Sequence, residues 1–387
     1  ADGNPLKNVN VLKHQDSGVF NIMTDEYGNF AISDIVNSND CEISVLKNDD
    51  FLNGVTTLDL ILIQRHILGL DIFDQSRKYV AADVNNDKRV SAGDLIELRK
   101  LILGITNKFS HNKSWRFITE LPDFDRISSI DVNEKYVIEK GIKDFNELNF
   151  MGIKLGDIND DSNLKSNQEF RNSNVEEIKV VINKLEGDEQ IVSFYATSSF
   201  DLNGFQMSLD VRKLDGFEIV NNQLEIGQDN VHFNGKSINI SFGSGNSVLI
   251  NDFEPLFSLV LKSKSVNETF IGLNSTFKSE VYYSDLSQRT IQLNHLENND
   301  GIVLSNAKPN PFSQETLIEF KNCKSGAVSI EVYNITGNLI FSKSINSIKG
   351  SNELGISSNQ LGNKSGVYFY KLTSDGESRS GKFVLIN

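Results

Sequence analysis

Regularly spaced acid and amide side chains are the residues of this sequence best suited to chemistry. The segment 83–94, DVNNDKRVSAGD, places oxygen-bearing side chains at loop positions 1, 3, 5, 9 and 12. Calcium takes roughly six to eight hard oxygen ligands, and this spacing can wrap them round one ion as the loop enters a helix. We therefore predict a calcium site here. Its ligands would be the side chains of Asp83, Asn85, Asp87 and Asp94, the carbonyl of Arg89 and, through a water molecule, Ser91.

Two residues of this loop bear on whether it holds the ion. Position 6 usually has a glycine at positive φ, and Lys88 stands there instead, at a cost of about 1 kcal/mol. Ser91 can also cap the helix that follows, so ligation and helix initiation would reinforce each other. The alternative is an acidic turn that caps a helix with no ion present.

The helix after this loop has an earlier counterpart. Residues 56–69 (TTLDLILIQRHILG) align with residues 91–104 (SAGDLIELRKLILG), so that Asp59 falls on Asp94 and both segments end in Ile-Leu-Gly. The matching apolar periodicity and terminal glycine predict two helices from an internal duplication.

The first repeat is the weaker metal candidate. Its register offers Asn48, Asp50 and Asp59 as ligands, but Leu52 at position 5 cannot ligate, so the sequence leaves calcium binding there open. A third fragment, residues 157–161 (DINDD), has the opening ligand spacing with no helical pattern after it. We expect this fragment to be a solvated turn.

The paired loops and helices resemble a type I dockerin. That resemblance implies two calcium-bound helices that pack together and dock a β-sandwich partner, cohesin. The family commonly has Ser-Thr at loop positions 10 and 11, where this sequence has Thr57-Leu58 and Ala92-Gly93.

The segments on either side of the helices read as β-structure. Residues 1–47 resemble a truncated carboxypeptidase regulatory-like module, with a turn at 25–28 and a half-buried strand expected over 30–32. Residues 175–296 alternate like a sandwich and are similar to cohesin, a generic immunoglobulin-like sandwich being the alternative. The first helix is too apolar for a single helical partner, so we expect it to pack on the sandwich, in cis or between molecules.

The last eighty-five residues or so carry the most specific resemblance. The stretches LSNAKPNPF, VSIEVYNITGNLI, GVYFYKL and GKFVL follow one another to the C-terminus. Together they are similar to the type A C-terminal sorting domain of the type IX secretion system. This implies a folded signal read by the outer-membrane translocon and the surface-attachment machinery. The residues that carry the signal would be Pro309, Asn310, Pro311, Phe312, Gly337, Gly366, Tyr368, Gly381 and Lys382.

Composition excludes several classes of function. The chain has 387 residues, 39% of them hydrophobic, and a net charge of −14, which disfavours nucleic acid as a partner. No apolar run approaches the roughly 18 residues that a membrane-spanning helix needs. Phosphate-binding loops, zinc-protease motifs and nucleophile elbows are missing, so we expect no enzyme. Trp115 could stack on a sugar or anchor a core, and we favour the core.

We therefore expect a multidomain, mainly β protein: small β-sandwiches flanking a short all-α, calcium-binding dockerin-like helix pair. The expected domains are residues 1–47, 48–160, 175–296 and 302–387, with polar linkers over 160–174 and 297–301. The predicted function is the non-catalytic C-terminal region of a secreted or cell-surface protein of a Gram-negative bacterium. A start at Ala1 suggests a piece of a longer protein. The alternatives are an adhesin, a carbohydrate-binding protein or the appendage of an upstream enzyme.

Overall fold

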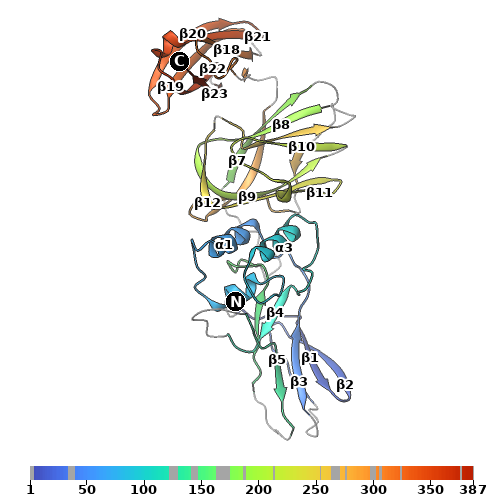
Figure 1. Cartoon of the computed structure of the whole chain (residues 1–387). Helices are drawn as coiled ribbons and strands as arrows, with labels where there is room; N and C mark the ends of the chain where they lie inside the picture. The colour runs from blue at the N-terminus through green and yellow to red at the C-terminus, as the bar shows by residue number, and fades with distance from the viewer. Residues whose placement is uncertain are drawn as a thin grey trace.

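The fold is taken from a computed structural model of the whole chain. Figure 1 shows an N-terminal sheet, a group of helices, a large β-sandwich and a C-terminal β-domain following one another along the molecule. The two predicted linkers lie largely outside the described residues. The structure describes residues 4–386 except 34–39, 122–129, 141–146, 163–174, 186–188, 212–213, 253, 263–270, 275–276, 297–301, 305–306, 323–324 and 375–376.

The N-terminal sheet has the order β2-β1-β3-β5, with antiparallel pairings. The fourth strand comes from beyond the helices, so the expected segments 1–47 and 48–160 share one sheet. The strand expected over residues 30–32 is absent from this described stretch, and that prediction is wrong. Phe30 and Ile32 pack on the sheet's core as irregular chain, and β2 remains the edge strand of the sheet. The strands are β1 (Asn10–Gln15), β2 (Gly18–Met23), β3 (Cys41–Leu46) and β5 (Lys135–Ile138).

Both predicted helices form, as α1 (Thr57–Ile67) and α3 (Ala92–Ile102), and α2 (Ser76–Ala82) lies between them. They share a core with Val55, Phe109 and Leu155. A two-stranded ribbon, β4 (Trp115–Ile118) with β6 (Met151–Lys154), runs from this core toward the N-terminal sheet. Trp115 is buried in the core of that sheet, which confirms it as a core anchor.

The two repeats begin and end their helices in the same way. Thr56 caps α1 and Ser91 caps α3, each in a reciprocal capping box with the aspartate three residues on. Gly69 and Gly104 follow the helix ends with φ of 71° and 74°. In this left-handed region glycine has no steric penalty, which explains the common Ile-Leu-Gly ending.

A large sandwich follows, with the strand path β10-β13-β8-β7-β16-β15-β9-β12-β11 and with β14 paired to β9. Strands β7 and β16 are parallel, and the other pairings described are antiparallel. Its core is lined by alternate residues of the predicted apolar runs, including Val192, Phe194, Leu259 and Leu261. The strands are β7 (Val175–Lys184), β8 (Glu189–Ala196), β9 (Phe200–Val211), β10 (Gly216–Asn221), β11 (Val231–Phe233), β12 (Ser237–Ile250), β13 (Phe257–Lys262), β14 (Ile271–Leu273), β15 (Glu280–Tyr283) and β16 (Gln288–Leu296).

The C-terminal domain is a smaller sandwich of two sheets, β17-β18-β21 and β20-β19-β22-β23, around a core of its own. The fold class predicted from the sequence is thus confirmed. Among the described residues no helix has the length and apolarity to cross a membrane. The strands are β17 (Ile302–Leu304), β18 (Glu315–Asn322), β19 (Gly326–Asn334), β20 (Leu339–Ser347), β21 (Gly350–Ser357), β22 (Gly366–Ser374) and β23 (Glu377–Leu385).

Candidate functional site

The predicted calcium loop connects α2 to α3 and is shaped by its own polar side chains. The two carboxylate oxygens of Asp83 accept hydrogen bonds from the backbone N–H groups of Asp87 (3.0 Å) and Lys88 (3.2 Å). Asn85 Oδ1 also accepts from the Asp87 N–H (2.9 Å). Asp94, in the first turn of α3, accepts from the Asn85 N–H (3.2 Å). These bonds link the four predicted side-chain ligands into one connected network.

The backbone of this loop is left-handed at two residues, Asn86 (φ 60°) and Lys88 (φ 69°). The second is the position at which the sequence predicted a positive φ without glycine, and the structure confirms it. Beyond it, the Arg89 N–H donates to Asp87 Oδ1 (3.0 Å), which continues the turn toward α3.

Burial makes the carboxylates of this loop costly to ionise. Asp83 and Asp94 are fully buried, and burial raises the pKa of Asp94 to about 6. Burial also raises the pKa of Asp83, opposed by the guanidinium of Arg116, whose Nη1 lies 3.8 Å from Asp83 Oδ2. A buried set of hard oxygen donors is the chemistry that calcium prefers.

The oxygen atoms of this loop are of the type that calcium binds, although they do not already surround one common position. Within the described residues, no three His, Cys, Asp or Glu side chains form a metal-binding group. In this loop an Asn amide is one of the donors, and the carboxylates accept backbone N–H bonds. A carboxylate oxygen has two lone pairs, so an ion can be bound without the loss of those bonds.

The predicted ligands of the first repeat are dispersed. Asn48 Oδ1 accepts from the Ser114 N–H (2.9 Å), and the carbonyl of Asp50 accepts from Lys154 Nζ (2.9 Å). Asp59, in contrast, lies in the first turn of α1, where Thr56 donates to its Oδ2 through N–H (2.8 Å) and hydroxyl (3.2 Å). Each of the three therefore bonds to a different part of the chain.

Asp59 instead meets the third acidic fragment. Its Oδ1 accepts from the N–H of Ile158 (2.7 Å). Asp157 and Ile158 are each only 1% exposed, whereas Asn159 is exposed, so the expectation of a solvated turn is wrong for the first two residues of the fragment. The apolar Ile158 enters the helical core and carries the fragment with it. Burial, followed by the charges of Asp157 and Asp161, raises the pKa of Asp59 well above its usual range.

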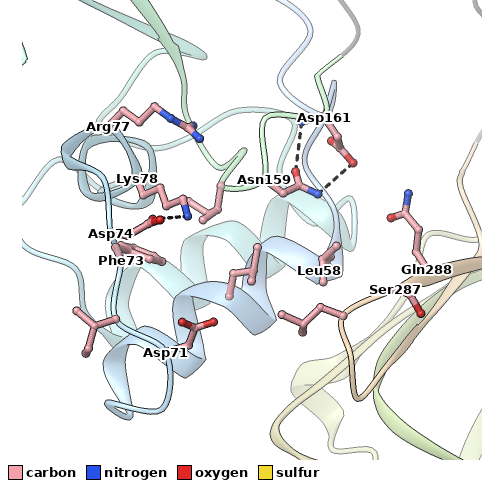
Figure 2. A pocket seen from close by; sticks show the side chains of 14 residues that line it. Leu58, Asp71, Phe73, Asp74, Arg77, Lys78, Asn159, Asp161, Ser287 and Gln288 are labelled. Atoms are coloured by element: carbon pink, nitrogen blue, oxygen red, sulfur yellow. Dashed lines mark hydrogen bonds and ion pairs between the residues drawn. The ribbon is translucent and has the colours of Figure 1, made fainter. Parts of the chain in front are cut away.

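A pocket of ≈ 690 Å³ lies beside this fragment, between the helices and the sandwich. Figure 2 shows Asn159 and Asp161 joined by hydrogen bonds at one side of the pocket and Leu58 of α1 beneath them. Ser287 and Gln288 line the pocket from the sandwich, and Asp74 and Lys78 lie across from them.

The expected packing of α1 on the sandwich is present and occurs within the chain. Thr57 donates its N–H to Gln206 Oε1 (2.8 Å), and its hydroxyl lies 2.7 Å from that of Ser241. Leu58 and Ile61 form a buried cluster with Tyr282. From the end of α3, the carbonyl of Leu103 accepts from Asn239 Nδ2 (2.9 Å).

The close approach of α1 depends on glycines in β9 and β12. A Cβ placed on Gly243 would lie 3.0 Å from Ile61 Cγ1, and one on Gly245 would lie 2.6 Å from Leu68 Cδ1. A Cβ on Gly204 would lie 2.8 Å from Ile61 Cδ1. These strands therefore present a shallow apolar face to the helix, which sequence analysis missed because Gly204 and Gly243 are adjacent only across the sheet.

Most of the predicted sorting residues gather around the last strand. Asn310 joins β23 by accepting from the Val384 N–H (2.8 Å) and donating to the carbonyl of Lys382 (3.2 Å). Phe312 is buried against Phe383, with ring centroids 5.5 Å apart. Pro309 and Pro311 flank Asn310, each after a cis peptide bond.

The remaining predicted residues have separate places in this domain. Tyr368 is buried, and its hydroxyl donates to the carbonyl of Lys364 (2.7 Å). Gly381 lies under the Tyr370 ring. A Cβ placed on Gly381 would be 2.5 Å from Cζ of that ring. Gly337, at φ 78°, closes the β19–β20 hairpin away from this group, and Gly366 begins β22 in open space.

Comparison with known families supports two of the resemblances. Residues 52–103 match the dockerin type I domain, and residues 307–387 match the secretion system C-terminal sorting domain. The chain thus contains a dockerin segment and a sorting segment. The likenesses of 1–47 to a carboxypeptidase regulatory module and of 175–296 to cohesin remain predictions.

The structural similarities are remote. The BSP domain of a biofilm associated protein is 8% identical, with a TM-score of 0.19 over 57% of this chain and 53% of its own. Dimeric latent PorU from Porphyromonas gingivalis is 13% identical, with a TM-score of 0.22 over 54% of this chain and 20% of its own. A tetra-tandem repeat of a large adhesion protein has a TM-score of 0.20 at 7% identity, over 99% of this chain and 67% of its own. No curated protein sequence matches the chain significantly.

Proposed function

We propose that this chain is the C-terminal, non-catalytic part of a secreted or cell-surface protein exported by the type IX secretion system. In this proposal, recognition rather than reaction is its mechanism. The single observation that carries the export role is the match of residues 307–387 to a secretion system sorting domain. The outer-membrane translocon of a Gram-negative bacterium would read this domain as a folded signal.

The geometry of the tail supports a folded signal over a linear one. Asn310 and Phe312 are early in the domain, yet they bond and pack against β23 at its end. A receptor that contacts this side meets both ends of the domain at once, so only a folded tail would present the complete surface.

The remaining domains would form a stalk. Helix α1 is covered by β9 and β12, through the Thr57 hydrogen bonds and the cluster around Ile61. The dockerin segment therefore has a β-sandwich partner within its own chain, as dockerins have in cohesin. An intramolecular partner leaves this face closed to a second one and fixes the helices to the sandwich.

Calcium would stabilise this stalk through the loop at residues 83–94. The residues that would hold it are Asp83, Asn85, Asp87 and Asp94, with Arg89 and Ser91 as the weaker contributors predicted from the spacing. An ion that binds only the native state adds about 2.7 kcal/mol of stability at a hundredfold excess over its Kd. Calcium is plentiful outside cells, so this stabilisation would follow export.

Export of deletion and point variants in a host with a type IX system tests the proposal. Removal of residues 307–387 should leave the protein in the periplasm. Asn310→Ala removes two contacts to β23 and should reduce surface delivery. Ile335→Ser is the matched control, since Ile335 is 77% exposed in the distant hairpin turn, and it should be delivered normally. Surface delivery of the tail-less chain would disprove the export role.

A further inference from the structure

The turn at residues 157–161 reproduces, bond for bond, the first half of the calcium loop. Asp157 Oδ1 accepts from the Asp161 N–H (3.2 Å), and its Oδ2 accepts from the Ser162 N–H (3.0 Å). Asn159 Oδ1 accepts a second bond from the Asp161 N–H (3.3 Å). The same three bonds connect Asp83, Asn85, Asp87 and Lys88 in the loop before α3.

The backbone agrees with the hydrogen bonds. Asp160 has φ 59° where its counterpart Asn86 has φ 60°. The counterpart of the closing aspartate, Asp94, is Asp59, which is likewise fully buried in a capping box and accepts a backbone N–H from the turn. Asp157 lies 98 positions after Asp59 in the sequence, and the fold brings the turn that begins at Asp157 to Asp59.

One atom in this arrangement lacks the partner that its burial requires. Asp161 Oδ1 is inaccessible to solvent and makes no hydrogen bond, while Oδ2 of the same carboxylate contacts Asn159 Nδ2 (3.3 Å). A buried carboxylate oxygen without a donor is costly, by the desolvation of a charged group. The oxygen belongs to the residue at ligand position 5, so a cation at the centre of the turn would satisfy it.

We propose that Asp157, Asn159 and Asp161 together with Asp59 form a second, split calcium site, in which the ligand turn follows the helix in sequence instead of preceding it. The ion would take one oxygen from each residue of the turn and two from Asp59, and water would complete its shell. This assignment replaces Asn48 and Asp50 as ligands of the first repeat. It is independent of the export role.

The position of the split site gives it a consequence for the stalk. Its residues Asp157 and Asp161 belong to the last described part of the helical region before the sandwich begins. Asp59 is two residues from Thr57, which bonds to Gln206 and Ser241 of the sandwich. An ion here would therefore connect residues 157–161, where the chain leaves the helical region, to the N-terminal end of α1, which bonds to the sandwich.

The experiment is calcium titration of the chelator-treated full chain by isothermal calorimetry, with magnesium as the competing ion. We expect two calcium ions per chain. Asp161→Asn should bind one, Asp87→Asn should bind one, and the double variant none. Asp160→Asn is the matched control, because it removes a charge from the same turn while Asp160 pairs with Arg77 at 2.5 Å outside the ligand set. It should still bind two.

Hydrogen exchange at the Ile158 amide gives a second, local measurement. This N–H donates to Asp59 Oδ1, so calcium should slow its exchange in the native chain and in Asp87→Asn but not in Asp161→Asn. One ion in the native chain, lost on Asp87→Asn and retained on Asp161→Asn, would overturn the split site and leave the loop at 83–94 intact. A native chain that binds no calcium would overturn both sites without bearing on export.

Discussion

The two junctions of the sandwich differ in kind. On the side of the helices, α1 and α3 bring buried hydrogen bonds and an apolar cluster that includes residues of both domains. On the side of the tail, Lys382 Nζ meets Glu254 Oε1 at 2.7 Å, with side chains 52% and 29% exposed. The sandwich and the tail have separate hydrophobic cores. The first junction is built like a protein interior and the second like a contact between surfaces.

This difference fits the two proposed roles. A stalk needs a fixed geometry, which close packing and satisfied buried polar groups provide. A sorting signal needs to be accessible to a receptor, and a polar contact with the adjacent domain leaves most of its surface free. The following predictions test the comparison, beginning with the change of largest expected effect.

Ile61→Asp should disrupt the helical junction. Ile61 is fully buried between the glycines of β9 and β12, and a carboxylate there would lose its hydration without gaining a partner. We expect a loss of at least about 3 kcal/mol in the free energy of unfolding, measured with urea, and separate melting of the two domains.

Ile96→Asp is the control for that change. It places the same charge on α3 at a residue that is 55% exposed, where substitutions usually change stability by less than about 0.5 kcal/mol. Equal effects of the two variants would contradict the interior character of the junction.

Gly243→Ala should cost about 1–3 kcal/mol, since the new Cβ would lie 3.0 Å from Ile61 Cγ1 and force the helix outward. Combination with Ile61→Ala makes room for that methyl group. The double variant should therefore lose less stability than the sum of the single variants, in a double-mutant cycle measured by urea unfolding. Additive losses would mean that the two residues do not meet.

The junction between the helices and the sandwich could be predicted from the sequence only in part. The apolar excess of α1 indicated that a second surface must cover it, because Leu58, Ile61 and Leu62 exceed what α3 can bury. The helix caps and the hydrogen-bonded turn at 83–94 were also predictable, since their residues are close in sequence. Local spacing is enough to specify such features.

The split site was not predictable in this way. Asp59 pairs with a turn that lies beyond α3 and three further strands, β4, β5 and β6, and no local spacing connects them. The repeat of the ligand triplet at 157–161 was a signal, but the absence of a helix after it suggested a solvated turn. The missing helix is α1 itself. Likewise, β5 pairs with β3 although the whole helical segment lies between them in sequence. Reading the sequence from one end to the other therefore assigns the two strands to different domains.

Thr57→Val should have an intermediate effect at the helical junction. It keeps the shape of the side chain but leaves the buried Ser241 hydroxyl without its partner at 2.7 Å, at a cost of about 1–2 kcal/mol. Thermal unfolding measures the loss. Thr336→Val removes a similar hydroxyl contact from an exposed turn of the tail, and its melting temperature should stay close to that of the native chain.

Lys382→Ala should have the smallest effect, because it removes an exposed ion pair between the sandwich and the tail. Pairs of this kind contribute about 0–1 kcal/mol and weaken with salt. Urea unfolding at low and high salt should therefore show a small loss that disappears at high salt, while Lys343→Ala on exposed β20 serves as the charge-matched control. A loss above about 2 kcal/mol, or one independent of salt, would mean that the tail is held as firmly as the helices. The tail would then be fixed to the stalk, whereas a separable sorting signal must be free of it.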